Sequence, residues 1–329
     1  MRSVAVRRRP GVLLTELGFG AAQGGNLYRA RSEQTFAAAV DAAWDAGIRY
    51  FDTAPHYGLG LSERRLGAAL RSRPRDDYVV STKVGRLLVA SPGTAHLTDA
   101  EGFEVAADHR RVWDFSRDGV LRSLEASLER TGLDRIDVVY LHDPDDHWQQ
   151  AATEAVPALV ELRDQGIVRA IGAGMNQSQM LTRFVRETDI DLVMCAGRFT
   201  LLEQGALHDL LPAAAEQAVT VVIAGVYNSG LLARDRPPAD ARYNYQRAPA
   251  ALLDRARRIA QICESYGATL PEAALAYVRT HIAVSCTVVG LGSTAQVKEN
   301  VRRAGADVPA GLWPALVSAG LIGHVPLRR

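Results

Sequence analysis

Short apolar runs alternate with longer amphipathic segments along nearly the whole chain. The runs are rich in Val, Ile, Leu, Ala and Tyr without polar alternation, which is typical of strands covered on both faces. They lie at 15–21, 49–52, 78–83, 137–142, 169–174, 191–196, 219–224 and 286–290. The segments predicted as helices lie at 33–46, 62–71, 118–130, 152–165, 178–187, 206–217 and 252–266. This alternation predicts a single (β/α)8 barrel domain over residues 1–329.

A doubly wound sheet is the competing α/β architecture, and the sequence disfavours it. After the first predicted strand the chain reads GFGAAQGG, in which Gln23 stands at the third glycine position of the dinucleotide-binding fingerprint G-x-G-x-x-G. The phosphate-binding pattern GxxxxGK is absent from the sequence. The barrel therefore remains the predicted fold.

Two segments interrupt the regular alternation, and both should lie at the end of the barrel where the strands finish. Residues 86–117 form an insertion after the third predicted strand, which we interpret as a lid or substrate wall, with an ordered surface loop as the alternative. Phe103, Trp113 and Phe115 could give this insertion an apolar face. The second segment is 233–249. The residues that precede the first barrel strand are expected to cap the barrel.

Composition narrows the possible partners. The chain has 329 residues, with 38 basic and 37 acidic side chains, so no overall field directs it to nucleic acid or membrane. No apolar run approaches the roughly 18 residues that a membrane span needs, and no signal peptide is evident. Three cysteines without close spacing are expected to be buried, reduced thiols, and no metal-ligand motif is present. We expect a cytoplasmic protein with a small-molecule substrate and no metal. The sequence does not decide the oligomeric state.

Four titratable residues fall at or near the ends of predicted strands. Asp52 ends the run IRYFD, Lys83 ends YVVSTK, His142 ends IDVVYLH, and Tyr57 follows Asp52 by five residues in TAPHYGLG. The carboxyl ends of parallel barrel strands converge on one rim. Each residue alone could be a cap, an ion-paired lysine, a loop histidine or a packed tyrosine. Together they indicate a site for proton transfer.

These side chains suit one another chemically. A tyrosine hydroxyl, with a pKa near 10, is a poor base at neutral pH, and a neighbouring lysine should lower that pKa. Asp52 would keep the ammonium of Lys83 charged, and His142 could hydrogen-bond the same substrate oxygen as Tyr57. Proton transfer at a carbinol or carbonyl oxygen is half of a redox step. Side chains cannot transfer the hydride, so a nicotinamide cofactor is implied.

Five segments, in this order along nearly the whole chain, resemble the aldo/keto reductase family. They read FDTAPHYGLGLSE, STKVGR, IDVVYLHDPD, VRAIGAGMN and VVGLGSTAQVKEN. The resemblance implies a (β/α)8 barrel that uses NAD or NADP. It also implies an Asp–Tyr–Lys–His tetrad at Asp52, Tyr57, Lys83 and His142.

Softer motifs are similar to a sugar-oxidising branch of that family. NLYRA, AGRFTLLEQGAL and AGVYNSGLL resemble fucose, D-threo-aldose and L-galactose 1-dehydrogenases, and also pyridoxal 4-dehydrogenases. This resemblance implies oxidation of a cyclic hemiacetal to a lactone, with Tyr57 as the base and with Tyr57, His142 and Trp113 in contact with the substrate. The alternatives are a pyridoxal 4-dehydrogenase, an NADPH-dependent reductase of aldehydes or ketones, and a cofactor-binding regulatory subunit, which the intact tetrad disfavours.

The resemblance also implies a set of cofactor contacts. Asn176 would bind the nicotinamide carboxamide, although Met175 stands where many members have serine, and Ala224 replaces an aromatic residue that stacks on the ring. The loop over the pyrophosphate and the adenosine end complete the set. The implied contacts are Gly20, Ala21, Asp52, Asn176, Gly225, Val226, Asn228, Gly290, Gly292, Gln296, Glu299 and Asn300.

The adenosine end also bears on the choice of cofactor. Members that prefer NADP often carry Lys or Arg where this chain has Gly292 and Gln296, because a 2′-phosphate is best bound by fixed cations. Lys298 is near in sequence, but helical spacing from Gln296 is expected to turn it away. We therefore predict that NAD is preferred over NADP.

Overall fold

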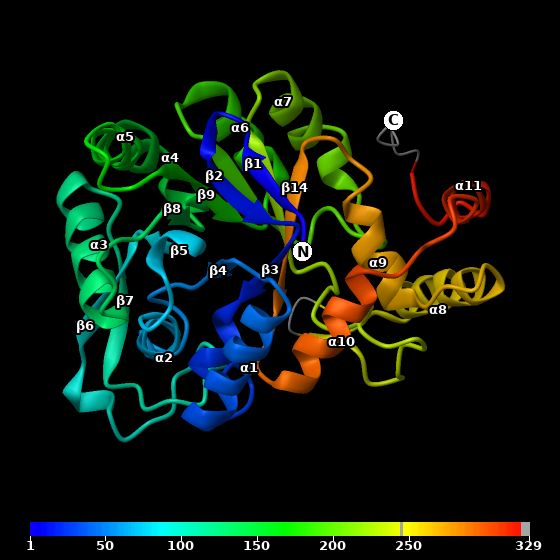
Figure 1. Cartoon of the computed structure of the whole chain (residues 1–329), viewed down its shortest axis with the longest axis horizontal. Helices are drawn as coiled ribbons and strands as arrows, with labels where there is room; N and C mark the ends of the chain where they lie inside the picture. Colours follow the sequence, from blue (N-terminus) through cyan, green and yellow to red (C-terminus); the bar gives the residue numbers. More distant parts are fainter. Residues whose placement is uncertain (244–245, 324–329) are drawn as a thin grey trace.

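Eight parallel strands close into a barrel in the computed structural model, which describes residues 1–243 and 246–323 (Figure 1). Each predicted run overlaps one barrel strand, so the predicted (β/α)8 fold is confirmed. In order around the ring the strands are β3 (Leu17–Gly20), β4 (Tyr50–Asp52), β5 (Val79–Val84), β8 (Val138–His142), β9 (Ala170–Met175), β10 (Leu192–Ala196), β11 (Thr220–Ala224) and β14 (Val284–Gly290), which pairs with β3.

Helices surround the strands and form the main core with them (Figure 1). The seven predicted helices are confirmed as α1 (Glu33–Asp45), α2 (Leu61–Leu70), α3 (Arg117–Thr131), α5 (Val156–Asp164), α6 (Ser178–Glu187), α7 (Leu210–Glu216) and α8 (Ala250–Ser265). The sequence pattern missed α9 (Leu270–Val278), α10 (Thr294–Ala304), α11 (Leu312–Ser318) and the short α4 (Trp148–Gln150). The sequence of α9, LPEAALAYV, is apolar on almost all sides, so it shows no amphipathic period.

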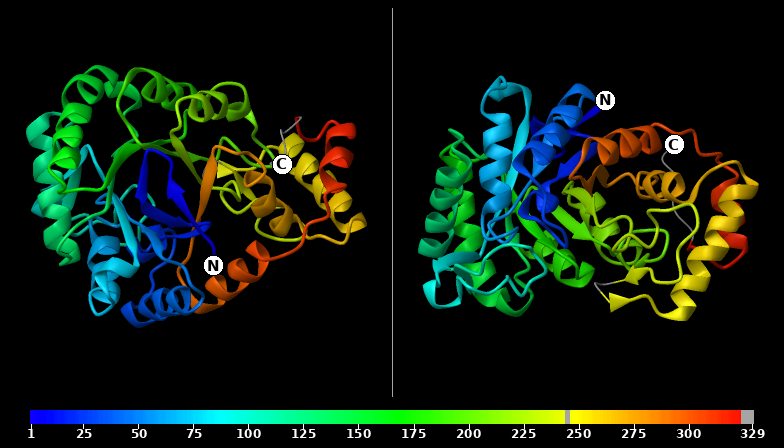
Figure 2. Two further views of the ribbon diagram at one scale, coloured as in Figure 1. Left: turned by 45° about the horizontal axis from the view of Figure 1, so that its top comes forward. Right: turned by 90° about the horizontal axis from the view of Figure 1, so that it is seen from below.

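The N-terminal residues cap the barrel, as predicted. Strands β1 (Ser3–Val6) and β2 (Arg9–Thr15) form an antiparallel hairpin that lies across the ring of strands (Figure 2). Val6, Val12 and Leu14 of this hairpin are buried in one cluster with residues from inside the barrel, among them Tyr50 and Tyr140. The hairpin therefore closes the end of the barrel at which the strands begin.

The insertion at 86–117 contains a second hairpin, β6 (Arg86–Ala90) and β7 (His109–Trp113). Its connecting segment meets the loop after β3, where Leu27 and Phe103 form an isolated bridge and the amide of Tyr28 donates to the carbonyl of Gly102 at 2.9 Å. The insertion thus reaches over the carboxyl ends of the strands, where the prediction of a lid or wall placed it.

The segment 233–249 includes two short paired strands, β12 (Arg242–Tyr243) and β13 (Gln246–Arg247), while residues 244–245 lie outside the described structure. Arg242 lines a small cavity together with Tyr28, Gly102 and Ser229, which places this segment on the same side as the insertion. Within the described part of the chain, no helix is long and apolar enough to cross a membrane. That the whole chain is a single domain stays a prediction.

Candidate active site

Asp52 and Lys83 form a buried ion pair at the carboxyl ends of neighbouring strands. Both residues are only 2% exposed, and Nζ of Lys83 lies 2.7 Å from Oδ2 of Asp52. The same ammonium donates to the carbonyl oxygen of Thr53 at 2.9 Å. Strands β4 and β5 pair with Asp52 opposite Ser81, which brings Lys83 up beside the carboxylate. Lys83 lines a cavity of about 610 Å³ together with Tyr57 and His142, and we call it the rim cavity; Asp52 lies behind Lys83.

A chain of hydroxyls lies beneath this ion pair. Oγ of Ser81 donates to Oδ1 of Asp52 at 2.7 Å, and the hydroxyl of Tyr50 lies 3.0 Å from Ser81 and 3.1 Å from the hydroxyl of Tyr140. Our sequence reasoning missed these residues, although a signal was present. Each stands two positions before a predicted site residue, and side chains two apart on a strand share a face. The chain satisfies the second oxygen of Asp52 and fixes its position.

Tyr57 is positioned by a close approach between two loops. Its turn lies against the loop after β3, where a Cβ on Gly58 would come within 2.3 Å of the carbonyl oxygen of Gly25, and Gly58 has a φ of +62°. Ser62 adds a hydrogen bond of 2.7 Å to the carbonyl of Ala21. Because glycine adopts positive φ without a steric penalty, the glycines of the YGLG motif allow this contact. The contact places the Tyr57 ring so that Nζ of Lys83 lies 4.8 Å from its centroid.

The pKa of Tyr57 shifts in the opposite direction to the prediction, although Lys83 acts on it in the predicted sense. Burial raises the pKa of the Tyr57 hydroxyl; the ammonium of Lys83 acts in the opposite direction, and the Asp52 carboxylate adds to the rise. The sequence-based expectation of a lowered pKa was therefore wrong, because it left out the cost of burying a phenolate. Burial is the largest single influence on Lys83 and lowers its pKa, but Asp52 and Tyr57 together outweigh it, so the net pKa is raised. At neutral pH the site holds a charged lysine beside a protonated tyrosine.

His142 completes the cluster as a neutral imidazole. Burial, followed by the charges of Arg86 and Lys83, holds its pKa well below the usual value. Its ring meets the ring of Tyr57 edge to face, with centroids 5.9 Å apart. Nδ1 of His142 is buried, and no group within residues 1–243 and 246–323 is hydrogen-bonded to it. The structure thus brings all four predicted residues together, with an uncharged histidine able to hydrogen-bond a substrate oxygen.

A charged wall next to the tetrad was not predicted. Arg86 forms an ion pair with Asp143, and both residues line the rim cavity together with His56. Nη1 of Arg86 lies 3.3 Å from Nδ1 of His56. Signals for this wall were present in the sequence, because Arg86 follows Lys83 by three residues and Asp143 follows His142 directly.

Trp113, predicted to contact the substrate, does not line the rim cavity. It is 45% exposed on β7, and its ring stacks on Phe115 with centroids 5.9 Å apart. The guanidinium carbon of Arg86 lies 4.3 Å over the Trp113 ring. Trp113 therefore lies behind Arg86, and Phe103 is the aromatic residue of the insertion that lines the cavity.

The rim cavity also has space for a flat ring beside the tetrad. Small residues at the ends of three successive strands, Gly174, Ala196 and Ala224, line it together with Asn176. The side chain of Asn176 donates to the carbonyl of Ala196 at 3.0 Å, which fixes its amide at the edge of this space. Larger side chains at these positions would fill the cradle. The residues present therefore fit a nicotinamide.

A loop and a helix that could hold the remainder of a dinucleotide are joined to each other. The hydroxyl of Tyr227, in the loop after β11, donates to Asn300 of α10 at 2.7 Å. Within that loop Gly225 has a φ of +63°, Asn228 accepts a hydrogen bond of 2.7 Å from Thr200, and the buried Val226 could offer only its backbone.

At the start of α10, the side chain of Gln296 accepts a hydrogen bond of 2.9 Å from the amide of Gly292. Glu299 is ion-paired with arginines of its own helix. Gly20 and Gly290 are register partners at the ends of β3 and β14, and Ala21 follows directly. Sequence reasoning missed Arg31 here: a Cβ on Gly292 would lie 2.7 Å from its Nε. A cation from the loop before α1 therefore stands beside the position that sequence reasoning took to lack one.

Comparisons with known proteins agree with this geometry. A family model described as the aldo/keto reductase family matches residues 16–308. The chain is 51% identical over 315 residues to a D-threo-aldose 1-dehydrogenase from Pseudomonas sp, covering 95% of this chain and 96% of the relative. It is 37% identical over 331 residues to a pyridoxal 4-dehydrogenase from Microbacterium luteolum, with coverage of 95% and 96%. Among solved structures, the holo form of an aldo-keto reductase from Bacillus halodurans has a TM-score of 0.74 and 26% identity, with coverage of 97% of this chain and 96% of that chain.

Proposed function

The chain belongs to the aldo/keto reductase family, and we propose that it oxidises the hemiacetal carbon of a sugar of the L-fucose or D-threo-aldose type to a lactone. The observation that carries this proposal is the cluster of Asp52, Tyr57, Lys83 and His142 around one cavity. The 51% identity to a D-threo-aldose 1-dehydrogenase favours a sugar as the substrate.

Tyr57 carries the proton in the proposed reaction. Tyr57 acts after its own proton has gone to solvent: as the hydride leaves the anomeric carbon, the phenolate oxygen of Tyr57 takes the proton of the anomeric hydroxyl, and the C–O bond becomes a carbonyl. Lys83 favours the phenolate that this transfer requires, and Asp52 holds Lys83 in place. The neutral His142 donates a hydrogen bond to the reacting oxygen and fixes its direction.

Nicotinamide, when bound, supplies the hydride acceptor. We propose that Asn176 binds its carboxamide, that the loop of Gly225, Val226 and Asn228 covers the pyrophosphate, and that Gln296, Glu299 and Asn300 lie at the adenosine end. Gly20, Ala21, Asp52, Gly290 and Gly292 remain proposed contacts from the neighbouring strand ends.

We propose NAD as the preferred cofactor, since Gly292 and Gln296 themselves carry no charge. Arg31, which lies beside Gly292, is a nearby cation that we propose contacts the 2′-phosphate of NADP, and substitution of Arg31 tests its effect on the preference. A cytoplasmic location and the absence of nucleic-acid and membrane partners stay predictions.

The proposal is tested by following absorbance at 340 nm with NAD⁺ or NADP⁺ and a panel of aldoses, pyridoxal and simple aldehydes. We expect L-fucose or a related aldose to be oxidised with NAD⁺. Faster oxidation of pyridoxal than of every aldose would support the second candidate, which the 37% identity to a pyridoxal 4-dehydrogenase favours. Reduction of simple aldehydes with NADPH, without oxidation of any hemiacetal, would contradict both.

A further inference from the structure

We propose that Arg86 and Asp143 form a clamp that binds the ring hydroxyls of a polyhydroxylated substrate. This pair, and not the tetrad, would then select sugars over aldehydes that lack hydroxyls. The inference rests on the proposed function, because it assigns substrate recognition at the same site.

The clamp residues follow the strand ends that carry Lys83 and His142, so they lie next to the tetrad. Strands β5 and β8 are paired neighbours that end at Val84 and His142; Arg86 follows the first and Asp143 follows the second. Oδ2 of Asp143 lies 3.8 Å from Nε2 of His142. A sugar whose anomeric oxygen meets Tyr57 and His142 therefore presents its other hydroxyls to this pair.

Arg86 is fixed before any substrate arrives. Its guanidinium lies over the Trp113 ring, faces Nδ1 of His56 and is ion-paired with Asp143. Since an arginine can only donate, Nδ1 of His56 accepts, and His56 is neutral. Burial and the charges of Arg86, Arg111 and Lys83 lower the pKa of His56 to about 2. Groups held by such surroundings lose little freedom when a ligand binds.

The backbone around both residues takes uncommon conformations. Asp143 has a φ of +45°, although it is not glycine, and its amide donates to the carbonyl of Gly174 at 2.9 Å. Gly85, just before Arg86, has a φ of +102°, and a Cβ there would come within 2.1 Å of the Phe115 ring. A positive φ at a residue other than glycine, as at Asp143, persists only where the surroundings enforce it, and such positions concentrate at ligand-binding sites; Gly85 adopts its φ without strain. The bends on both strands therefore direct the pair to the cavity.

The pair retains unused hydrogen-bonding capacity. Oδ2 of Asp143 accepts from Arg86, but none of the described residues donates to Oδ1, and the side chain of Asp143 is 30% exposed. A free carboxylate oxygen beside guanidinium N–H groups matches two adjacent hydroxyls, since each hydroxyl both donates and accepts. Leu27 and Phe103 line the cavity as well and offer an apolar surface to the C–H groups of a sugar ring.

The clamp predicts a specific pattern of discrimination. A substrate without hydroxyls leaves charged groups unpaired when it excludes water, and sites built to bind a hydroxyl reject such analogues strongly. We expect kcat/KM with NAD⁺ to be at least about 10²-fold higher for L-fucose than for 2-hydroxytetrahydropyran, a cyclic hemiacetal with the same reacting carbon and no other hydroxyl.

Asp143→Asn is the principal test, because asparagine tolerates positive φ and keeps the size of the side chain. We expect kcat/KM for L-fucose to fall by about 10–100-fold, with at most a two- to threefold change for 2-hydroxytetrahydropyran and no change in the Kd of NAD⁺. Arg86→Lys keeps the charge but loses the planar fork, so it should reduce the same ratio to a lesser extent. Asp146→Asn, an exposed position in the same loop, and Arg110→Lys, an exposed position on β7, are the matched controls.

Three outcomes would overturn the clamp: equal losses for both hemiacetals, no loss for either, or a wild-type protein that does not distinguish them. Failure of the proposed function is separate, since it appears as no oxidation of any hemiacetal by the wild-type protein. In that case, the rates of reduction of glyceraldehyde, which carries hydroxyls, and of propanal, which carries none, would be compared instead. Equal effects of Asp143→Asn on these two aldehydes would then overturn the clamp, and a selective loss for glyceraldehyde would support it.

Discussion

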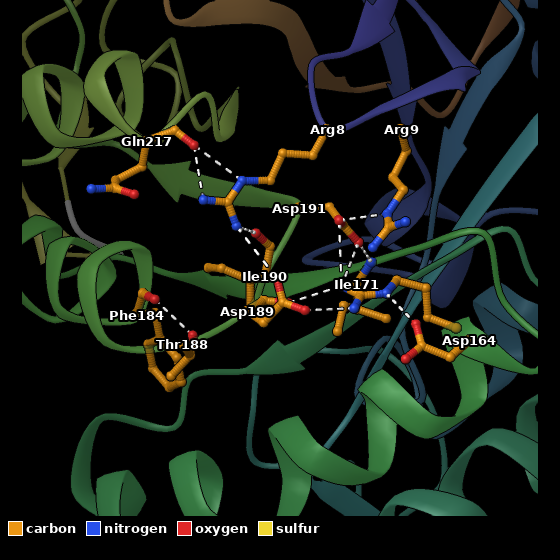
Figure 3. Close-up of polar contacts among 11 residues, drawn as sticks. Arg8, Arg9, Asp164, Ile171, Phe184, Thr188, Asp189, Ile190, Asp191 and Gln217 are labelled. Atoms are coloured by element: carbon orange, nitrogen blue, oxygen red, sulfur yellow. Dashed lines mark hydrogen bonds and ion pairs between the residues drawn. The ribbon is translucent and has the colours of Figure 1, made fainter.

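Both ends of the barrel bury carboxylates against cations, yet the two ends differ in how completely the buried groups are satisfied. At the end where the strands begin, Asp191 is fully buried, and the network around it is shown in Figure 3. Asp191 accepts from Nε of Arg9 at 2.8 Å and from the amide of Ile171 at 3.0 Å, and Arg163 lies 3.4 Å from both of its oxygens. Arg8 adds bonds to the carbonyls of Gln217 and Ile190. This network joins the N-terminal hairpin to the barrel.

At the opposite end, Asp52 is paired with a single lysine, and the groups around it are left incomplete. Nδ1 of His142 has no partner among the described residues, and Tyr57 and Asp143 face a cavity. Polar groups whose hydrogen bonds are all made within the protein cannot bind a ligand, whereas groups with an unused donor or acceptor can. A buried ion pair alone therefore does not mark an active site; the combination of an ion pair, unsatisfied neighbours and space does.

Tyr57→Phe gives the largest expected effect at the rim. Removal of one hydroxyl should reduce kcat by about 10²–10⁴-fold, because the proton then has no carrier, while the Tm and the Kd of NAD⁺ stay close to wild type. Single-turnover kinetics and cofactor titration measure the two effects. Unchanged turnover would mean that the cluster binds cofactor without performing the proton transfer.

Asp191→Asn tests the other end, where the expected loss is in stability instead. The change removes the fully buried carboxylate beside Arg163, which keeps Asp189 at 2.6 Å; since complete loss of a buried partner costs about 3–5 kcal/mol, we expect a loss of about 3 kcal/mol. Urea unfolding should show this loss, while kcat of the folded protein stays unchanged. Asp164→Asn, which removes an exposed partner of the same arginine, should cost less than about 1 kcal/mol. If Asp191→Asn lost activity without losing stability, the conclusion that this end of the barrel serves stability and the rim serves catalysis would be wrong.

The neutral histidines of the rim predict a dependence of stability on pH. The pKa of His56 is lowered to about 2 and that of His142 well below its usual value, so the folded state resists protonation of both. Below about pH 6.5 the unfolded chain binds protons that the folded chain does not, so stability is full above that pH and falls as the pH is lowered toward 2. His56→Gln should reduce the slope of Tm against pH between 6.5 and 5. An unchanged slope would show that His56 is protonated in the folded protein.

The rate of oxidation should rise at a higher pH than a histidine base would give. Because the pKa of Tyr57 is raised and the phenol must lose its proton to act as a base, kcat/KM for oxidation should rise steadily through pH 7–10. A bell-shaped profile centred near neutrality would instead assign the proton transfer to a histidine. Lys83→Met should move the rise to higher pH, because Lys83 is the group that favours the phenolate.

The sequence predicted the barrel and the tetrad because both depend on local patterns. A strand covered on both faces has a recognisable composition, and Asp52, Lys83 and His142 each stand at the end of such a run. What it missed depends on contacts between distant segments or on energetic balance. The sign of the Tyr57 pKa shift depends on burial, and the position of Trp113 depends on how the β6–β7 hairpin packs.

Arg31 is another residue whose contacts could not be predicted from the sequence, and its substitution gives the smallest predicted effect, on cofactor binding. Unlike Arg9 and Arg163 at the opposite end, Arg31 has no carboxylate partner within the described residues, and burial and Arg29 lower its pKa. It reaches Gly292 from a loop about 260 residues earlier, so spacing in the sequence could not reveal it. A cation left unpaired beside a proposed adenosine site is suited to a phosphate.

Arg31→Met should therefore weaken NADP⁺ binding by up to about 10-fold and NAD⁺ binding by less, so that the preference for NAD increases. Fluorescence titration with both cofactors measures the difference, and Arg29→Met, an exposed neighbour, is the control. Equal losses would place the guanidinium on the pyrophosphate, which both cofactors share. No loss with either cofactor would mean that Arg31 does not bind the cofactor, although it has no carboxylate partner among the described residues. Unsatisfied polar groups would then indicate ligand binding only at the tetrad and its cavity.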